Sequence, residues 1–338
     1  MMNTRAWIAD LLAAMRGRRI AVIGDLMLDE WYWGSVRRIS PEAPVPVVEV
    51  NDHTYTLGGA GNVANNLAAL GAKVSVFGVV GNDEAGERLL GLFHKLHVDA
   101  SGVARVRSRP TTQKMRIVAH NQQVVRADRE ATSSIDGKVQ QWLVRAIGRL
   151  DGALDGVILS DYGKGLITRP LIQAVCNFKK GAVITADPKP QNLDAFVGVD
   201  WIAPNVAETE EAAGMRVRSD ADLARAAKIL MNRTRAKHVL VTRGEHGMSL
   251  FSKKGKPLWV PAMARQVYDV SGAGDTVMST LTLALAAGAT LERAVTLANL
   301  AAGVVVEKLG TATASSKEIL TFSEHQEFPR KKQRARRG

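Results

Sequence analysis

The sequence predicts an α/β fold with a mostly parallel central sheet, flanking helices and a small β-sheet lid. Short apolar runs typical of buried strands alternate with longer helix-like segments along most of the 338 residues. This alternation is typical of a parallel sheet covered by helices on both faces. Two stretches, 31–55 and 111–128, interrupt the alternation. They could pair into a lid over the carboxyl ends of the strands, where α/β proteins bind ligands.

The first part of the chain opens with an amphipathic helix over 1–16 and a buried strand over 19–28. Residues 31–55 are rich in Trp, Tyr, Pro and Val, which favours short edge strands over helix. The stretch 111–128 has a strand-like pattern with a turn near His120. Between these stretches we expect a helix, a strand and a second helix, at 58–70, 74–80 and 84–96.

The second part alternates regularly between helices and strands. Predicted helices cover 136–149, 168–179, 207–213, 219–233, 273–287 and 290–307. Predicted strands cover 156–160, 182–187, 200–203, 237–242, 247–251 and 256–260. We expect one domain over residues 1–328, followed by a basic, disordered tail over 329–338.

Composition narrows the class of protein. The net charge is +12, but the ten residues 329–338 contain six Lys or Arg and no acid, which leaves +6 for the rest. No nucleic-acid-binding motif accompanies the charge, and a basic body also suits anionic substrates. The single cysteine, Cys176, excludes a disulfide framework. With no secretory signal and no run of about 18 apolar residues, we expect a cytoplasmic protein without a membrane span.

Residues 269–276 (DVSGAGDT) are the strongest candidate for a site. Gly272 and Gly274 precede a long apolar helix, whose first N–H groups and positive dipole end would bind an anion such as phosphate. The amides of Gly272, Ala273 and Gly274 are therefore the candidate anion hole. Asp275 in the first turn could be a base for an attacking hydroxyl or could simply cap the helix.

Further polar residues follow other predicted strands. Asp25 and Asp29 could accept hydrogen bonds from sugar hydroxyls, or could form caps and salt bridges. A glycine-rich turn then leads into a helix with an amide side chain, and its candidate ligand-binding residues are Gly58, Gly59 and Asn62.

Lys164 and Lys189 lie on loops after strands, where a lysine can meet phosphate oxygens or remain solvated. Asn205-x-x-Glu208 could hold Mg²⁺ through water, or could form a helix-capping box. The turn at 242–247 could be a hairpin or a backbone cradle for a nucleotide. Its candidate residues are Thr242, Arg243, Gly244 and Gly247. The standard nucleotide-binding motifs are missing, since we find neither a P-loop nor a dinucleotide-binding G-x-G-x-x-G after the first strand.

Together and in this order, the motifs resemble those of the PfkB, or ribokinase-like, carbohydrate kinases. The two family signatures correspond to 58–81 (GGAGNVANNLAALGAKVSVFGVVG) and 269–275 (DVSGAGD). Asn205-x-x-Glu208 and the turn at 242–247 fall where the family places its NxxE and nucleotide loops. The resemblance covers about residues 18–322. It implies a ribokinase-like fold and an ATP- and Mg²⁺-dependent sugar kinase; a monovalent-cation requirement stays open.

The resemblance also implies roles for individual residues. Asp275 would be the base that deprotonates the sugar hydroxyl, and the amides of 272–274 would stabilise the transferring phosphoryl group. Asn205 and Glu208 would hold Mg²⁺ through water. Asn299 would lie on the adenine side of ATP. The sugar would be bound by Asp25, Asp29, Gly58, Gly59 and Asn62.

Within the family, the lid phrases at 38–47 and 121–126 resemble kinases of D-glycero-β-D-manno-heptose 7-phosphate, as do 160–165 and 187–189. This resemblance implies phosphorylation of O1 for ADP-heptose and lipopolysaccharide synthesis. Lys114, Arg116 and Lys189 would bind the distal phosphate, and the lid would form a homodimer. Bifunctional relatives carry a further nucleotidyltransferase domain, so we expect a monofunctional kinase here. The alternatives are another PfkB sugar kinase, of ribokinase, fructokinase or phosphofructokinase type, and a non-enzymatic sugar or nucleic-acid binder.

Overall fold

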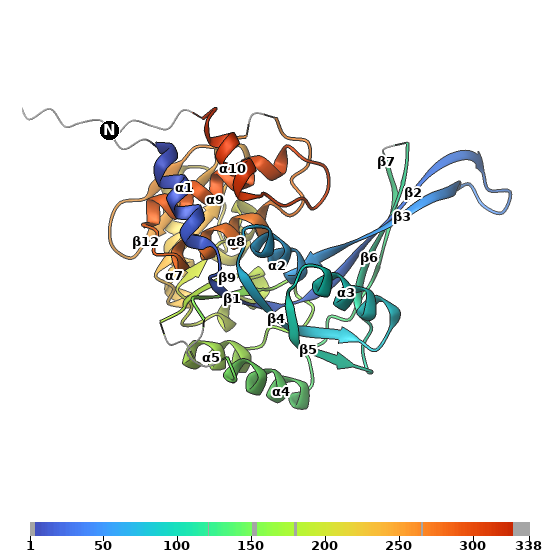
Figure 1. Ribbon diagram of the computed structural model, residues 1–338, viewed down its shortest axis with the longest axis horizontal. Helices are drawn as coiled ribbons and strands as arrows, with labels where there is room; N and C mark the ends of the chain where they lie inside the picture. Colours follow the sequence, from blue (N-terminus) through green and yellow to red (C-terminus); the bar gives the residue numbers. More distant parts are fainter. Residues whose placement is uncertain (1–3, 121, 151–153, 179–180, 265, 327–338) are drawn as a thin grey trace, which may run out of the picture.

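A large mixed sheet forms the centre of the molecule (Figure 1). The computed structural model describes residues 4–120, 122–150, 154–178, 181–264 and 266–326. Within them the sheet has nine strands in the order β13-β12-β11-β10-β9-β8-β1-β4-β5, and only the pairs β11/β12 and β12/β13 are antiparallel. The strands are β1 (Arg19–Gly24), β4 (Lys73–Gly81), β5 (Asp99–Val106), β8 (Gly156–Ser160), β9 (Val183–Asp187), β10 (Trp201–Ile202), β11 (His238–Thr242), β12 (Met248–Ser252) and β13 (Leu258–Val260).

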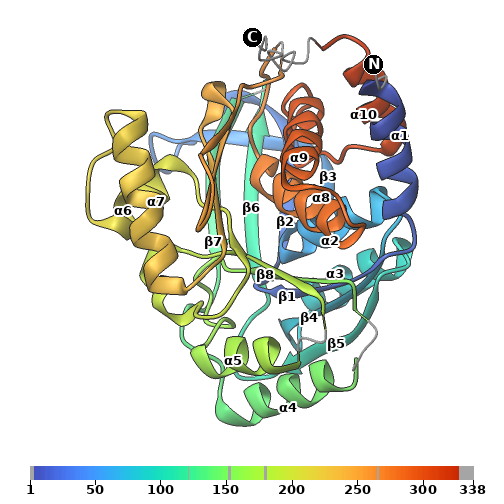
Figure 2. The same ribbon diagram turned by 90° about the vertical axis from the view of Figure 1, so that its left-hand side faces the viewer.

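Helices cover both faces of this sheet, as the alternation predicts. Helices α1, α2, α3, α8 and α9 share one apolar core, whereas α4, α5 and α7 share the other. Figure 2 shows α8, α9 and α2 on the opposite side of the strands from α4 and α5. The helices are α1 (Thr4–Met15), α2 (Ala60–Ala69), α3 (Glu84–Lys95), α4 (Gly137–Gly148), α5 (Arg169–Phe178), α6 (Val206–Ala213), α7 (Asp220–Thr234), α8 (Ala273–Ala286), α9 (Leu291–Val306) and α10 (Ser316–Ser323), with 3₁₀ turns η1 (Pro190–Ala195) and η2 (Gly244–His246).

A second sheet of four strands forms the lid and extends away from the body (Figure 1). Its order is β3-β2-β6-β7, so the two stretches 31–55 and 111–128 do pair with each other. The expectation of short edge strands over 31–55 is wrong, because β2 and β3 are fourteen residues each and form one long hairpin. The strands are β2 (Leu26–Ile39), β3 (Pro46–Gly59), β6 (Thr112–Ala119) and β7 (Gln122–Arg129).

Three further differences separate the observed elements from the predicted ones. The strand predicted over 19–28 divides at Asp25, because the chain there leaves the central sheet and enters the lid. Strand β5 and helix α10 were not predicted.

Within the described residues no helix is long and apolar enough to cross a bilayer. The tail at 329–338 lies outside the described residues.

Candidate active site

The carboxylate of Asp275 lies at the centre of the candidate site. Helix α8 begins at Ala273, and Gly272 immediately before it has a φ of 76° that favours glycine. Asp275 in the first turn is buried, and its two oxygens accept hydrogen bonds from two distant side chains. Asn62 Nδ2 donates to Oδ2 over 2.8 Å, and Tyr162 Oη donates to Oδ1 over 2.6 Å.

Burial raises the pKa of Asp275 to about 6. The hydrogen bonds from Tyr162 and Asn62 oppose this rise because they stabilise the charged form. The negative charge of Asp29 adds to the rise, and the positive charge of Lys189 opposes it. A carboxyl group with such a pKa is ionised at neutral pH and can still accept a proton, as a general base must.

Two main-chain N–H groups beside Asp275 have no acceptor in the described part of the chain, those of Gly272 and Gly274. The third predicted member of the anion hole, Ala273, donates its N–H to Val270 O over 3.2 Å. A Cβ atom on Gly274 would meet nothing within 4 Å, so open space lies beside this residue. A Cβ on Gly272 would lie 2.7 Å from Asn62 Nδ2, so a side chain there would displace the amide that holds Asp275.

The glycine-rich turn before α2 lies against this centre. Gly59 has a φ of 54°, and a Cβ on Gly58 would lie 2.5 Å from a carboxylate oxygen of Asp29. Asn62, fully buried in the first turn of α2, reaches Asp275 across 213 residues of sequence. The predicted association of Gly58, Gly59, Asn62 and Asp275 in one place is therefore present.

Asp25 and Asp29 differ in what they contact. The carboxylate of Asp25 is buried and accepts main-chain N–H groups from Tyr162, Lys164 and Leu166, at 2.8, 3.1 and 3.2 Å. It thus holds the loop that follows β8. Asp29 accepts a hydrogen bond of 2.7 Å from Arg116 of the lid strand β6. Of these two predicted sugar-binding residues, Asp29 lies near enough to Asp275 to raise its pKa.

A group of acidic residues surrounds Lys189 after β9. Lys189 Nζ lies 2.6 Å from Glu208 Oε1, and the ammonium lies over the Tyr162 ring. Burial raises the pKa of Asp187 well above its usual value, and the charge of Glu208 adds to this effect. Lys189 therefore joins the Asn205–Glu208 motif, whereas the other two predicted phosphate-binding cations, Lys114 and Arg116, lie on the lid.

The capping-box alternative for Asn205 and Glu208 is present at the start of α6. Asn205 Oδ1 accepts the N–H of Glu208 over 2.8 Å, and Glu208 Oε2 accepts the N–H of Asn205 over 3.0 Å. The described residues contain no group of three or more His, Cys, Asp or Glu that could hold a metal ion. The hard oxygens of Asp187 and Glu208 fit Mg²⁺ only if phosphate oxygens and water complete its shell, as Mg²⁺ commonly requires.

The predicted nucleotide loop at 242–247 is a hairpin turn between the antiparallel strands β11 and β12. Gly244 and Gly247 both have positive φ, and Arg243 is bonded to Ser249 and Asp220. Thr242 ends β11 and forms an isolated parallel β-bridge with Asn205, so this turn lies next to the NxxE motif. Asn299 on α9 is buried and donates to Pro261 O over 2.6 Å.

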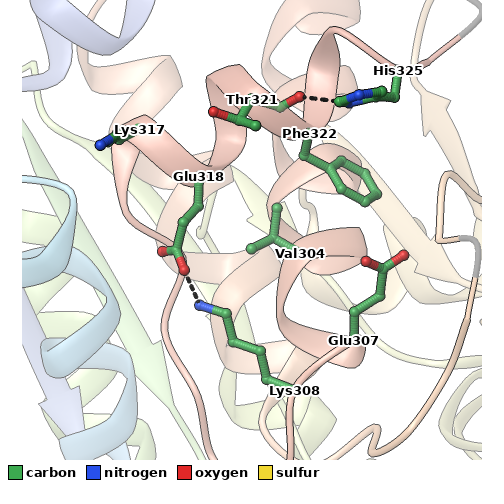
Figure 3. A pocket seen from close by; sticks show the side chains of 8 residues that line it. All are labelled: Val304, Glu307, Lys308, Lys317, Glu318, Thr321, Phe322 and His325. Carbon is green, nitrogen blue, oxygen red and sulfur yellow. Dashed lines mark hydrogen bonds and ion pairs between the residues drawn. The ribbon is translucent and has the colours of Figure 1, made fainter.

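A separate cavity of about 590 Å³ lies between α9 and α10 (Figure 3). Two of its lining residues, Lys308 and Glu318, form an ion pair of 2.6 Å. None of the predicted site residues lines this cavity.

Comparison with known proteins identifies the class of enzyme. Residues 18–318 match the family model described as pfkB family carbohydrate kinase. The chain therefore belongs to the pfkB family of ATP-dependent carbohydrate kinases.

Relatives and solved structures agree with this class. The protein named "Bifunctional protein HldE" of Desulfatibacillum aliphaticivorans is 48% identical over 303 residues, which cover 89% of this chain and 62% of the relative. The protein of the same name from Geobacter sulfurreducens is 44% identical over 301 residues, which cover 88% of this chain and 61% of the relative. The chain thus spans less than two thirds of the length of these relatives.

The fold is that of ribokinase-like kinases. Arabidopsis thaliana ribokinase, solved with ribose and ATP, aligns with a TM-score of 0.72 at 20% identity over 92% of this chain and 100% of that one. Escherichia coli phosphofructokinase-2 aligns with a TM-score of 0.74 at 20% identity over 91% of this chain and 99% of that one. The predicted ribokinase-like fold with a separate small sheet is confirmed.

Proposed function

We propose that this kinase transfers the γ-phosphoryl group of ATP to O1 of D-glycero-β-D-manno-heptose 7-phosphate. The product would be the 1,7-bisphosphate used for ADP-heptose and the inner core of lipopolysaccharide. The lid phrases that resemble heptose-7-phosphate kinases support this substrate, as does the similarity to the HldE proteins. The observation that carries the proposal is the ionisable Asp275 beside two amides that have no acceptor among the described residues, with Lys114 and Arg116 on the lid.

In the proposed reaction Asp275 accepts the proton of the O1 hydroxyl. O1 then forms a bond to the γ-phosphorus while the bond from that phosphorus to the β,γ-bridging oxygen breaks, which releases ADP. The amides of Gly272 and Gly274 would stabilise charge on the transferring group without reorganisation during the step. The N–H of Ala273 already has an acceptor, so Ala273 would only help to shape the turn that holds the other two amides.

Mg²⁺ bound with ATP would neutralise part of the phosphate charge. The ion would be held by Asp187 and, through water, by Asn205 and Glu208. The turn that contains Thr242, Arg243, Gly244 and Gly247 would lie along the ATP phosphates. Asn299 would act on the adenine side by fixing the segment at Pro261. Asp25 would act on the sugar site through the loop that it holds, and Asp29, Gly58, Gly59 and Asn62 would border the sugar.

The distal phosphate would bind to cations of the lid. Arg116 uses Nη1 for Asp29 and for Lys114 O, while its Nε and Nη2 have no acceptor within the described residues. A guanidinium with two such donors matches a phosphate bidentately. Lys114 lies two residues away on the same strand, and its Nζ lies 3.5 Å from Asp128 Oδ2. Lys189 remains a third candidate, from the side of the NxxE motif.

A panel of sugars tests the substrate, with coupled ADP release as the readout. Each sugar is offered with and without a terminal phosphate, at saturating MgATP. We expect the highest kcat/KM for D-glycero-β-D-manno-heptose 7-phosphate and at least a tenfold lower value for the unphosphorylated heptose. Higher values for ribose, fructose or fructose 6-phosphate would favour the alternative, another PfkB sugar kinase.

A further inference from the structure

Among the described residues, Asn62 and Tyr162 are the two side chains that donate to Asp275, and Tyr162 was not among the predicted site residues. Its Oη lies 2.6 Å from Asp275 Oδ1, although the two residues are 113 positions apart. The other oxygen of the carboxylate accepts Asn62 Nδ2. The phenol and the amide therefore hold Asp275 from two sides, one donor on each oxygen.

Two further carboxylates hold the loop that carries Tyr162. Asp25 accepts the N–H of Tyr162 itself and those of Lys164 and Leu166. Asp161 accepts the N–H groups of Gly163 and Lys189, at 2.8 and 3.1 Å. Because Asp25 and Asp161 are both buried, these bonds are shielded from water. The phenol therefore occupies a position that the framework of the sheet determines.

The phenol acts on Asp275 as a donor only. Burial raises the pKa of Tyr162 well above its usual value, and the nearby charge of Asp275 adds to this rise. The phenol thus keeps its proton at every pH at which the enzyme works. A hydrogen bond from a neutral donor to a carboxylate stabilises the charged form of the carboxylate. It also prevents rotation of the carboxylate, which leaves the remaining lone pairs pointing in fixed directions.

We propose that Tyr162 is a positioning residue, which orients the Asp275 carboxylate and keeps it anionic, and that Asp25 acts through the loop that carries Tyr162. This inference rests on the proposed role of Asp275 as the base. Asp25 was predicted from the sequence to bind the sugar. In this inference its role is indirect, because Asp25 holds the loop of Tyr162 and Tyr162 in turn holds Asp275.

The test is the pH profile of kcat/KM for Tyr162→Phe. The variant keeps the ring over Lys189 and removes the hydroxyl, so the pKa of Asp275 should rise and the acidic limb should move to higher pH. A hydrogen bond to a charged group corresponds to a shift of about one pH unit. Starting from a pKa of about 6, we expect a loss of about fivefold at pH 6 that approaches tenfold at lower pH, recovery above pH 8, and a KM for ATP within twofold of wild type. Tyr268→Phe is the matched control, because that hydroxyl is exposed and contacts only Gln266 among the described residues.

The outcomes separate this inference from the proposed substrate. If the wild type turns over another sugar of the panel instead of the heptose phosphate, the profile is measured with that sugar. An acidic limb that does not move in Tyr162→Phe, or a loss of equal size at every pH, overturns the role of Tyr162. Should Tyr162→Phe fail to fold, 3-fluorotyrosine at position 162 keeps the ring and strengthens the donor. The acidic limb should then move to lower pH, and an unmoved limb overturns the inference equally.

Discussion

At the scale of single residues, the proposed chemistry depends on a conflict at Asp275. A base must be ionised to accept a proton, but removal from water disfavours the ionised form. Here burial exceeds the effect of two hydrogen bonds and raises the pKa to about 6. The carboxylate is thus poised just below neutral pH, which is where a general base is most effective.

The wild-type pH profile follows from this value. Protonated Asp275 cannot accept the hydroxyl proton, so activity should be present above pH 6 and should be lost as the pH falls through about 6. We expect kcat/KM to fall tenfold per pH unit below that point. ADP release measured from pH 5 to pH 9 at saturating MgATP checks the limb. A plateau that extends to pH 5 would contradict the assignment.

Substitution of the base tests its role directly. Asp275→Asn keeps the size of the side chain and removes its ability to accept a proton, so kcat should fall by at least ~100-fold, the usual scale of general-base catalysis. Binding of MgATP, followed by calorimetry, should change little because the amides remain. Turnover within a few fold of wild type would remove Asp275 from the mechanism.

The residues of the site differ in how far the sequence could predict them. Gly272, Gly274, Asn62 and Asp275 were predictable, because glycine pairs before apolar helices and strand-end polar groups follow from local rules. Tyr162 was not, since a tyrosine in a loop has no spacing signal and meets Asp275 only after folding. The contacts of Asp25 were hidden for a related reason. The carboxylate oxygens of Asp25 accept hydrogen bonds from main-chain N–H groups, and such groups are the same for nearly every residue type.

At the scale of elements, the lid strand β6 brings Arg116 to Asp29, one of the residues proposed to border the sugar. Arg116 contacts Asp29, and its guanidinium lies 4.7 Å from the centre of the Trp31 ring. The strand thus holds a cation between an acid and an aromatic ring, next to the proposed sugar site.

Removal of this cation should affect one substrate. Arg116→Ala should raise KM for the phosphorylated sugar by about tenfold or more, the loss of a charge-assisted hydrogen bond. The KM for ATP should stay within twofold. Arg105→Ala is the matched control, because Arg105 on β5 pairs with Glu87 at the surface. An unchanged KM for the sugar phosphate would exclude Arg116 from the site.

Helix α10 gives an element-scale prediction for stability. Ser315 and Glu318 form a capping box, and Glu318 also pairs with Lys308 of the segment after α9 (Figure 3). Partial burial opposes ionisation of Glu318, but the hydrogen bonds from Lys308 and Ser315 outweigh it and lower the pKa to about 2. A carboxyl group with a lowered pKa stabilises the fold above its unfolded pKa and loses this effect as the pH falls through the folded value.

Glu318→Gln should therefore destabilise the protein at pH 7. The side chain is 44% exposed, so after discount for solvent screening we expect about 0.5–1 kcal/mol. The difference from wild type should shrink between pH 4.5 and pH 2 and vanish below that range. Urea unfolding at several pH values measures it. A difference that persists unchanged at pH 2 would contradict the assignment to this carboxylate.

Element types were predictable where periodicity was strong. Strand β8 has the predicted bounds because its five residues are buried on both faces and read as one apolar run. Strand β5 lies at the edge of the sheet and contains Asp99, Ser101 and Gly102, so its pattern is weak. The length of β2 and β3 was hidden because partly exposed strands with Pro and Gly read as short ones.

At the scale of the whole molecule, the alternation of elements is sufficient to predict the central sheet, whereas the shape of the lid depends on what surrounds it. The lid extends from the body, and every residue of its edge strand β7 is exposed (Figure 1). Exposed apolar side chains are spread over it: Trp33, Ile39, Val45, Val50, Val124 and Val125. An uncovered edge strand and exposed apolar groups on one element are typical of a protein interface.

A second copy of the chain, bound lid to lid, is the partner we propose for this surface. Light scattering coupled to size exclusion should give a dimer for the wild type. Val50→Lys and Ile39→Lys together should shift it to a monomer, because two buried charges without partners cost far more than the contacts they replace. Leu309→Lys, an equally drastic change at an 82% exposed position outside the lid, should leave the dimer intact. A wild-type monomer at assay concentration would contradict the proposal, and so would a double variant that remains dimeric, since the interface would then lie elsewhere.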